Sequence, residues 1–216
     1  DERDERDDII DADEDPGLDD DSADEDTDLD DAEDTDDADD DTVTFASLGL
    51  PEEILAAVTD MGFRVPTPIQ AAAIPPLLEL RDVVGIAQTG TGKTAAFGLP
   101  LLAIVDADER DVQALVLAPT RELAMQSAQA IEDFAARTAR LDVVPVYGGS
   151  PYGPQIGALK RGAQVVVGTP GRVIDLIEKG ALDLSNVRML VLDEADEMLR
   201  MGFAEDVETI ASAVPA

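Results

Sequence analysis

Two segments that lie far apart in the chain contain the residue types needed to hold a nucleoside triphosphate. In the first, "AQTGTGKT" at residues 87–94, Gly90 and Gly92 allow the backbone to turn its N–H groups towards phosphates at the start of a helix. Lys93 can reach the terminal phosphates, and the hydroxyl of Thr94 can ligate Mg²⁺. The alternative is a glycine-rich turn that only leads into a helix.

The second segment is acidic and supplies the groups that such a site needs beside its phosphates. It is "VLDEADEMLR", residues 191–200, and it continues the apolar run 189–192, which is typical of a buried strand. Asp193 can hold Mg²⁺ through water, and Glu194 can orient the attacking water. Helix capping is the alternative, since carboxylates also stabilise the first turn of a helix. Paired with Lys93, the segment favours a site that hydrolyses a nucleotide.

Short apolar runs and longer amphipathic stretches alternate from residue 42 onward, and these elements must position the two segments. The expected strands are 82–87, 114–118, 143–146, 164–167 and 189–192. The expected helices between them are 94–104, 121–137, 152–161 and 170–179. This alternation predicts an α/β fold with a doubly wound parallel sheet that is flanked by helices.

Ligands bind beyond the carboxyl ends of the strands in sheets of this kind. The segments that follow the five expected strands are all polar, glycine-rich or proline-rich: "AQTGTGKT", "PTREL", "YGGS", "GTPGR" and "DEAD". We therefore expect one functional rim on the sheet.

The charge of the chain is concentrated at its N-terminal end. The first 41 residues contain 26 Asp or Glu against two Arg, so they carry −24 of the net charge of −34 and leave −10 for the remainder. They contain few apolar residues and no aromatic residue, so they cannot bury enough surface to offset the loss of chain entropy. We expect a disordered acidic tail at 1–42 and a folded domain at 43–216.

The composition excludes several kinds of site. The chain has no Cys and no His, so disulfides and thiolate zinc sites are excluded, and any acid–base chemistry must come from Asp, Glu, Lys or water. The sequence has no apolar stretch of 18 residues and no basic-then-apolar N-terminus, which argues against membrane insertion and secretion. We expect a cytoplasmic protein.

The order and spacing of these segments resemble those of the DEAD-box ATP-dependent RNA helicases. The longer stretch "LVLDEADEMLRMGFAEDVETI" is most similar to the bacterial cold-shock type. The resemblance covers 43–216 and implies a RecA-like P-loop NTPase domain with ATP and Mg²⁺ as cofactors. In the family, alanine is normal at the first position of the phosphate loop, where the general pattern has glycine. The ATP-site residues implied are Phe45, Phe63, Thr67, Gln70, Ala87, Gln88, Thr89, Gly90, Thr91, Gly92, Lys93 and Thr94.

Within that set, "GFRVPTPIQ" at residues 62–70 is similar to the segment of the family that reads adenine. By resemblance, Gln70 would hydrogen-bond the adenine edge, Phe45 would stack near the base and Thr67 would support the loop. Asp193 and Thr94 would hold the metal.

Three further segments are similar to those with which the family grips the RNA sugar-phosphate backbone. Backbone N–H groups, hydroxyls and guanidinium ions bind phosphates without reading bases, so the expected binding is independent of RNA sequence. Each segment taken alone can also be explained as a turn and a helix cap. The residues implied are Pro119, Thr120, Arg121, Gly148, Gly149, Thr169, Gly171 and Arg172.

The family's next motif, Ser-Ala-Thr, should follow shortly after residue 210, and Asp196 should couple the ATP site to it. That motif and the second RecA-like domain are not in this sequence. We therefore expect this chain alone to be nearly inactive. We expect the full-length protein to be an RNA helicase that binds RNA, with ribosomal or RNA-decay proteins as further partners. The alternatives are a nucleotide-gated RNA-binding scaffold without useful turnover and a P-loop ATPase that acts on DNA.

Overall fold

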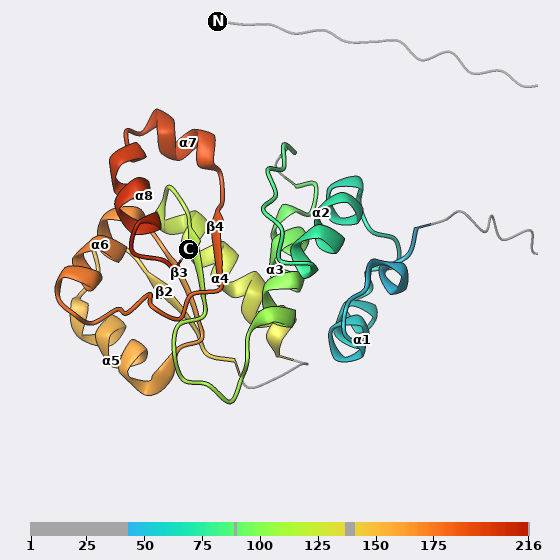
Figure 1. Cartoon of the computed structure of the whole chain (residues 1–216), viewed down its shortest axis with the longest axis horizontal. Helices are drawn as coiled ribbons and strands as arrows, with labels where there is room; N and C mark the ends of the chain where they lie inside the picture. The colour runs from blue at the N-terminus through green and yellow to red at the C-terminus, as the bar shows by residue number, and fades with distance from the viewer. Residues whose placement is uncertain (1–42, 89, 137–140, 216) are drawn as a thin grey trace, which may run out of the picture. The chain divides into compact units, whose positions relative to one another are not determined.

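The computed structural model describes residues 43–88, 90–136 and 141–215 (Figure 1). The predicted acidic tail at 1–42 and Thr89 of the phosphate loop lie outside the described residues.

The centre of the domain is a parallel sheet of four strands in the order β2-β3-β1-β4. Its strands are β1 (Ala114–Leu117), β2 (Val143–Val146), β3 (Val165–Gly168) and β4 (Met189–Leu192). Every residue of β1 and β3 is buried, as expected for the inner strands of a sheet that is covered on both faces. The predicted doubly wound architecture is confirmed.

Helices cover both faces of the sheet (Figure 1). One face carries α1 (Glu52–Asp60), α2 (Pro68–Leu78), α3 (Lys93–Ile104) and α4 (Arg121–Ala135), preceded by a short 3₁₀ helix, η1 (Phe45–Leu48). The other carries α5 (Tyr152–Gly162), α6 (Pro170–Glu178), α7 (Ala195–Arg200) and α8 (Ala204–Ala211).

Strand β1 shows how one strand serves both layers of helices. Ala114 and Val116 lie in the first core, whereas Leu115 and Leu117 lie in the second. Successive side chains of a strand point to opposite faces, so a continuous apolar run is what such a strand requires. None of the helices in the described ranges is long and apolar enough to cross a membrane.

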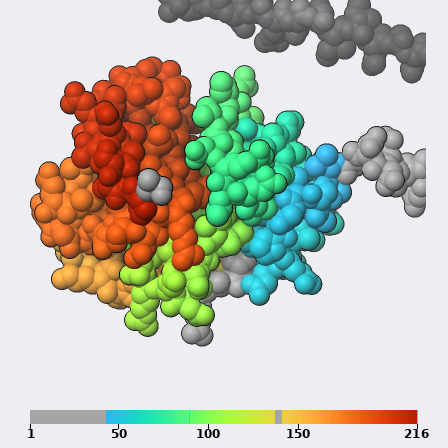
Figure 2. All heavy atoms as spheres, in the orientation of Figure 1, coloured from blue at the N-terminus to red at the C-terminus, as the bar shows by residue number. Residues whose placement is uncertain are grey.

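One predicted strand, 82–87, is wrong. Residues 81–88 form neither helix nor strand, and Val84 and Ile86 are 95% and 97% exposed. Figure 2 shows this part of the chain, in green, at the surface. A β-branched run becomes a strand only where a neighbouring edge takes up its hydrogen bonds, and no described strand pairs with this one.

The predicted rim is present beyond the carboxyl ends of the four strands that do form. After β1, the hydroxyl of Thr120 accepts a hydrogen bond from the backbone N–H of Leu123 and caps α4. After β3, Thr169 stands at the N-cap of α6 with a proline at the first helical position. The strand-to-helix turns therefore place the polar segments where the sequence predicted them.

Candidate nucleotide and RNA sites

The phosphate loop and the acidic segment meet in the structure. Lys93 opens α3, and its Nζ lies 2.8 Å from Oε1 of Glu194, which lies 101 residues further along the chain. Glu194 has a left-handed φ of 53° in the tight turn from β4 to α7. Both side chains are about three-quarters buried, so this ion pair is partly protected from water.

Asp193 stands beside this pair. Its backbone N–H donates to the carbonyl of Leu117 in β1, and its Oδ2 accepts a hydrogen bond of 3.1 Å from the hydroxyl of Ser127 in α4. Burial raises the pKa of the Asp193 carboxyl above its ordinary value, although the Ser127 hydrogen bond and the charge of Lys93 act in the opposite direction. A carboxylate in this position is stabilised by a cation that comes close to it.

These groups line one cavity of about 380 Å³, which lies in the size range of small-molecule sites. Its lining comprises Gly90, Gly92, Lys93, Thr94, Leu123, Gln126, Ser127, Asp193 and Glu194. The three residues from α4 were not predicted from the sequence. Leu123 is the last residue of "PTREL", and Gln126 and Ser127 follow three and four residues later, so all three lie on one face of α4; this spacing is the signal that could have identified them.

The donors in this cavity suit Mg²⁺. Thr94 and Asp193 contribute a hydroxyl and a carboxylate, both hard oxygen ligands. In the described part of the chain, no group of three or more acidic residues converges as a candidate metal site. Mg²⁺ is usually held by one or two carboxylates, with water and phosphate oxygens completing its shell, so the two protein ligands fit that ion.

The structure places Gln70 next to the phosphate loop but not with a free amide. Gln70 is 2% exposed; its Oε1 accepts from the backbone N–H of Thr67 at 2.9 Å, and its Nε2 donates to the carbonyl of Gly92 at 3.2 Å. The expected contact of Gln70 with the adenine edge stays a prediction. In this conformation the side chain ties the start of α2 to the phosphate loop.

The expected stacking residue Phe45 is also buried. Its ring is 3% exposed and packs edge-on against Phe63 at a centroid distance of 6.3 Å. Phe63 in turn contacts Phe134 of α4. In this conformation the Phe45 ring presents no open face, whereas Phe63 is 37% exposed, and stacking of Phe45 near the base stays a prediction. Elsewhere in the phosphate loop, the Thr91 hydroxyl donates to the carbonyl of Gln88 and stabilises the turn.

The residues expected to contact RNA differ in their exposure. Gly148, Gly149, Gly171 and Arg121 are exposed, and the Arg121 guanidinium carbon lies 4.7 Å from the centre of the Tyr147 ring. By contrast, Pro119 and Arg172 are buried, while Thr120 and Thr169 are half-buried. The guanidinium of Arg172 donates to protein acceptors, which differs from the expected contact with phosphate.

Asp196 lies on α7 away from the ion pair of the nucleotide cavity. Its carboxylate pairs with Arg200 of the same helix at 3.0 Å, and the side chain is 69% exposed. Its coupling role stays a prediction.

Comparisons with known proteins agree with this arrangement. The model of the family described as "DEAD/DEAH box helicase" matches residues 67–216. The chain is 59% identical over 175 residues to "ATP-dependent RNA helicase DeaD" of Haemophilus influenzae, covering 81% of this chain and 28% of that protein. It is 58% identical over 172 residues to the protein of the same name from Mycobacterium tuberculosis, covering 80% of this chain and 31% of that relative.

Among solved structures, a DEAD box protein from Methanococcus jannaschii matches with a TM-score of 0.76 and 46% identity, over 80% of this chain and 47% of that one. The chain spans less than a third of the length of the two helicases named above. The family model matches well over half of the chain, and the fold agrees with it. The chain belongs to the DEAD/DEAH box helicase family.

Proposed function

We propose that this chain is the ATP-binding half of a DEAD-box RNA helicase. The full-length protein would couple hydrolysis of Mg-ATP to local unwinding of RNA duplexes or to remodelling of RNA–protein complexes. The meeting of Lys93 with Glu194 at 2.8 Å, beside Asp193 and the phosphate-loop glycines, is the observation that carries the proposal. Helix capping alone explains acidic residues after a strand but does not explain their convergence with this lysine.

The ion pair suggests how the site changes when a nucleotide enters. The triphosphate offers Lys93 a stronger anion than Glu194 does, so the ammonium group moves to the phosphates and neutralises their charge. Glu194 is then released to orient the attacking water. Thr94 and Asp193 would hold Mg²⁺, which when bound supplies further charge neutralisation on the phosphates.

RNA would bind on the same rim of the sheet, beyond the carboxyl ends of β1, β2 and β3. Exposed backbone groups at Gly148 and Gly149 and the guanidinium of Arg121 support this placement. Such contacts hold the sugar-phosphate backbone without reading bases. We propose RNA as the principal partner, with ribosomal or RNA-decay proteins joining the full-length form.

The resemblance implies that a second RecA-like domain brings arginines to the ATP site. Arginine fingers are typically worth about 10³ to 10⁵ in rate. We therefore expect this chain alone to bind adenine nucleotide and hydrolyse it very slowly, whereas the full-length protein should show RNA-stimulated turnover.

The substitution Glu194→Gln in the full-length protein tests the enzymatic proposal. Loss of the carboxylate that orients water should lower RNA-stimulated ATP hydrolysis by about 100-fold or more, the range of general-base contributions, while ATP binding is kept. Steady-state turnover and fluorescent-nucleotide binding measure the two quantities separately.

The matched control is Glu197→Gln, which removes an equal charge from α7 at a residue that pairs with Arg200 outside the cavity. Glu197→Gln should leave turnover unchanged. Equal, low turnover in the wild type and in Glu194→Gln would favour the nucleotide-gated scaffold instead.

A further inference from the structure

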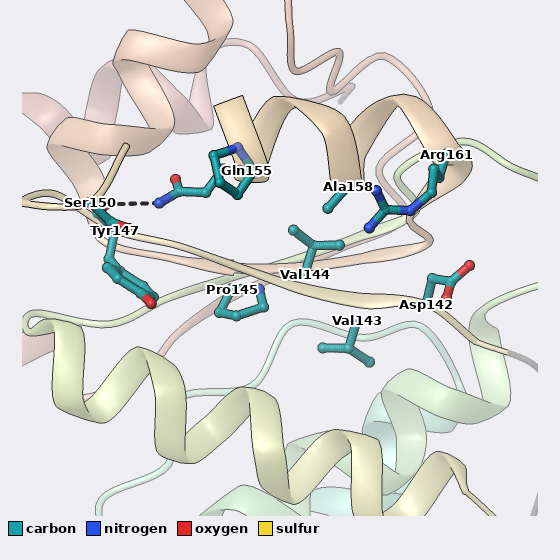
Figure 3. Close-up of a pocket in the computed structure, with 10 residues that line it drawn as sticks. Asp142, Val143, Val144, Pro145, Tyr147, Ser150, Gln155, Ala158 and Arg161 are labelled. Carbon is teal, nitrogen blue, oxygen red and sulfur yellow. Dashed lines mark hydrogen bonds between the residues drawn. The ribbon is translucent and has the colours of Figure 1, made fainter. Parts of the chain in front are cut away.

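The turn after β2 is held at both ends by two buried side chains. At its start, Nε2 of Gln155 in α5 donates to the carbonyl of Tyr147 at 3.2 Å. At its end, Nη1 and Nη2 of Arg172 in α6 both donate to the carbonyl of Ser150 at 3.0 Å. Figure 3 shows Gln155 reaching from its helix to the segment that contains Tyr147 and Ser150. The exposed glycines 148 and 149 lie between the two fixed carbonyls.

The two clamping side chains are also joined to each other. Oε1 of Gln155 accepts a hydrogen bond of 3.0 Å from Nη1 of Arg172. Both residues are 7% exposed, so neither presents its polar atoms to solvent. A guanidinium has a rigid fork of donors that suits two acceptors at fixed positions, and here the acceptors are a main-chain carbonyl and an amide.

Further contacts fix the plane of the Arg172 guanidinium. Its central carbon lies 4.1 Å from the centre of the Tyr152 ring, and its Nε lies 3.9 Å from Oδ2 of Asp175. The Tyr152 hydroxyl donates to the same Asp175 oxygen at 2.7 Å. The side chain of Arg172 is only 6% exposed in this setting, so a phosphate cannot approach it without dismantling the cluster.

We propose that Arg172 is a positioning residue for the turn at 147–150 and is not itself a contact to RNA. The exposed Arg121, which lies over the Tyr147 ring, is the cation that meets the phosphate at this turn. This assignment rests on the proposed RNA-binding function, and it separates two arginines that the sequence motifs treat alike.

The turn needs such a clamp because of its glycines. Gly149 has a left-handed φ of 75°, and glycine-containing segments lose the most conformational freedom when they are ordered. Fixing both carbonyls in the folded protein orders the turn before RNA arrives, so less ordering entropy opposes binding. Loss of the clamp should therefore weaken RNA binding without removing a charge from the interface.

The salt dependence of RNA binding distinguishes the two roles. When a cation that neutralises one phosphate of a single-stranded RNA is removed, the slope of log K against log salt falls by about 0.7. Fluorescence anisotropy with a single-stranded oligouridine probe on the full-length protein should show that slope reduction for Arg121→Gln. Arg172→Gln should weaken binding by about tenfold at every salt concentration, as expected for loss of hydrogen bonds to a charged group, with the slope unchanged.

Two further variants sharpen this comparison. Gln155→Ala removes an uncharged, buried side chain and should reproduce the Arg172→Gln result.

Lysine substitutions separate charge from geometry. Arg172→Lys keeps the positive charge but loses the rigid set of guanidinium donors, so it should fail to restore RNA binding. Arg121→Lys should retain most of the RNA affinity. The control is Arg188→Gln, which removes the same charge beside Glu109 at the amino end of β4 and should change nothing on the opposite rim. A reduced slope in Arg172→Gln, or full rescue by Arg172→Lys, overturns the proposal.

A measurement without RNA keeps this test independent of the proposed function. Amide hydrogen exchange at residues 148–150 should accelerate about tenfold or more in Arg172→Gln and in Gln155→Ala, because local opening of the turn becomes easier. Thermal unfolding of the same variants verifies that the domain is folded. Unchanged exchange at the turn refutes the clamp, whereas accelerated exchange in a protein that binds no RNA refutes only the proposed function.

Discussion

At the scale of single residues, the nucleotide cavity places two carboxylates in different environments. Glu194 is paired with the ammonium group of Lys93, whereas the Asp193 carboxylate accepts a hydrogen bond from the neutral hydroxyl of Ser127. Burial therefore dominates at Asp193 and raises the pKa of its carboxyl. A carboxylate desolvated in this way lowers the stability of the domain at neutral pH.

The substitution Asp193→Asn should change the stability of the domain in a pH-dependent way. Because the native pKa is raised, ionised Asp193 destabilises the native state at neutral pH. This destabilisation disappears as the pH falls through the native pKa towards the unfolded value near 3.8. Asp193→Asn should therefore raise Tm at pH 7, by about 2–4 °C for each kcal/mol of penalty removed, and the gain should vanish near about pH 4. Thermal unfolding in metal-free buffer at the two pH values measures the difference.

Asp183→Asn is the control of opposite sign. The backbone N–H of Ser185 lowers the pKa of the Asp183 carboxyl, so this group adds stability above its unfolded pKa. Its substitution should lower Tm at pH 7 and have no effect at low pH. A loss of Tm at pH 7 in Asp193→Asn would contradict the role given to burial.

Residue identities at the nucleotide site were largely predictable, but their hydrogen-bond partners were not. Four residues belong to motifs whose order and spacing predict their chemistry, and the structure brings them to one cavity: Lys93, Thr94, Asp193 and Glu194. Ser127 is absent from any motif because its role arises only when α4 packs on the sheet and brings this hydroxyl to the turn after β4. For the same reason, the burial of Phe45 and the two hydrogen bonds of the Gln70 amide could not be predicted from the sequence.

At the scale of elements, most of the fold follows from the alternation of apolar runs with amphipathic stretches and from the turn residues between them. Four of five predicted strands form within one residue of their predicted ends, because each apolar run has a neighbouring strand and a helix on both faces. The run at 82–87 is also rich in β-branched residues but has no described partner strand, and its valine and isoleucine side chains are exposed. Composition alone cannot reveal whether a partner is present.

The junction between the phosphate loop and α2 gives a prediction at this scale. Gly92 has a φ of 86°, and a Cβ there would collide with the Gln70 amide. Gly90 has a φ of 81°, but a Cβ there would meet open space. Gly90→Ala should cost about 1–2 kcal/mol of unfolding free energy through backbone strain alone. Gly92→Ala should cost more, because Gln70 must also move and lose its hydrogen bonds.

Urea denaturation of the two glycine variants measures this difference directly. Equal losses of unfolding free energy would show that Gln70 does not hold the phosphate loop. A larger loss for Gly92→Ala, together with weaker nucleotide binding, is the result expected from the packing.

At the scale of the whole molecule, charge is distributed very unevenly. The first 41 residues carry −24, and the remainder carries −10. A negative net charge opposes binding of nucleic acid except at local cations such as Arg121. We predict that the acidic residues 1–41 compete with RNA for such cations.

Deletion of residues 1–41 should therefore tighten RNA binding at low salt and have little effect at physiological salt, where charges more than about 8 Å apart are screened. Anisotropy titrations of the two proteins at both ionic strengths measure this effect. If RNA affinity at low salt is the same with and without residues 1–41, this segment has no role in RNA binding.

Lys93→Gln tests whether the phosphate loop and the acidic segment form one nucleotide site. Binding of a fluorescent ATP analogue with Mg²⁺ should weaken by about 10- to 100-fold, the range for a lost hydrogen bond between charged groups. Lys160→Gln removes the same charge at an exposed position in the last turn of α5 and serves as the control. We expect the control to bind like the wild type and Lys93→Gln to lose affinity; equal affinity of all three proteins would contradict the account.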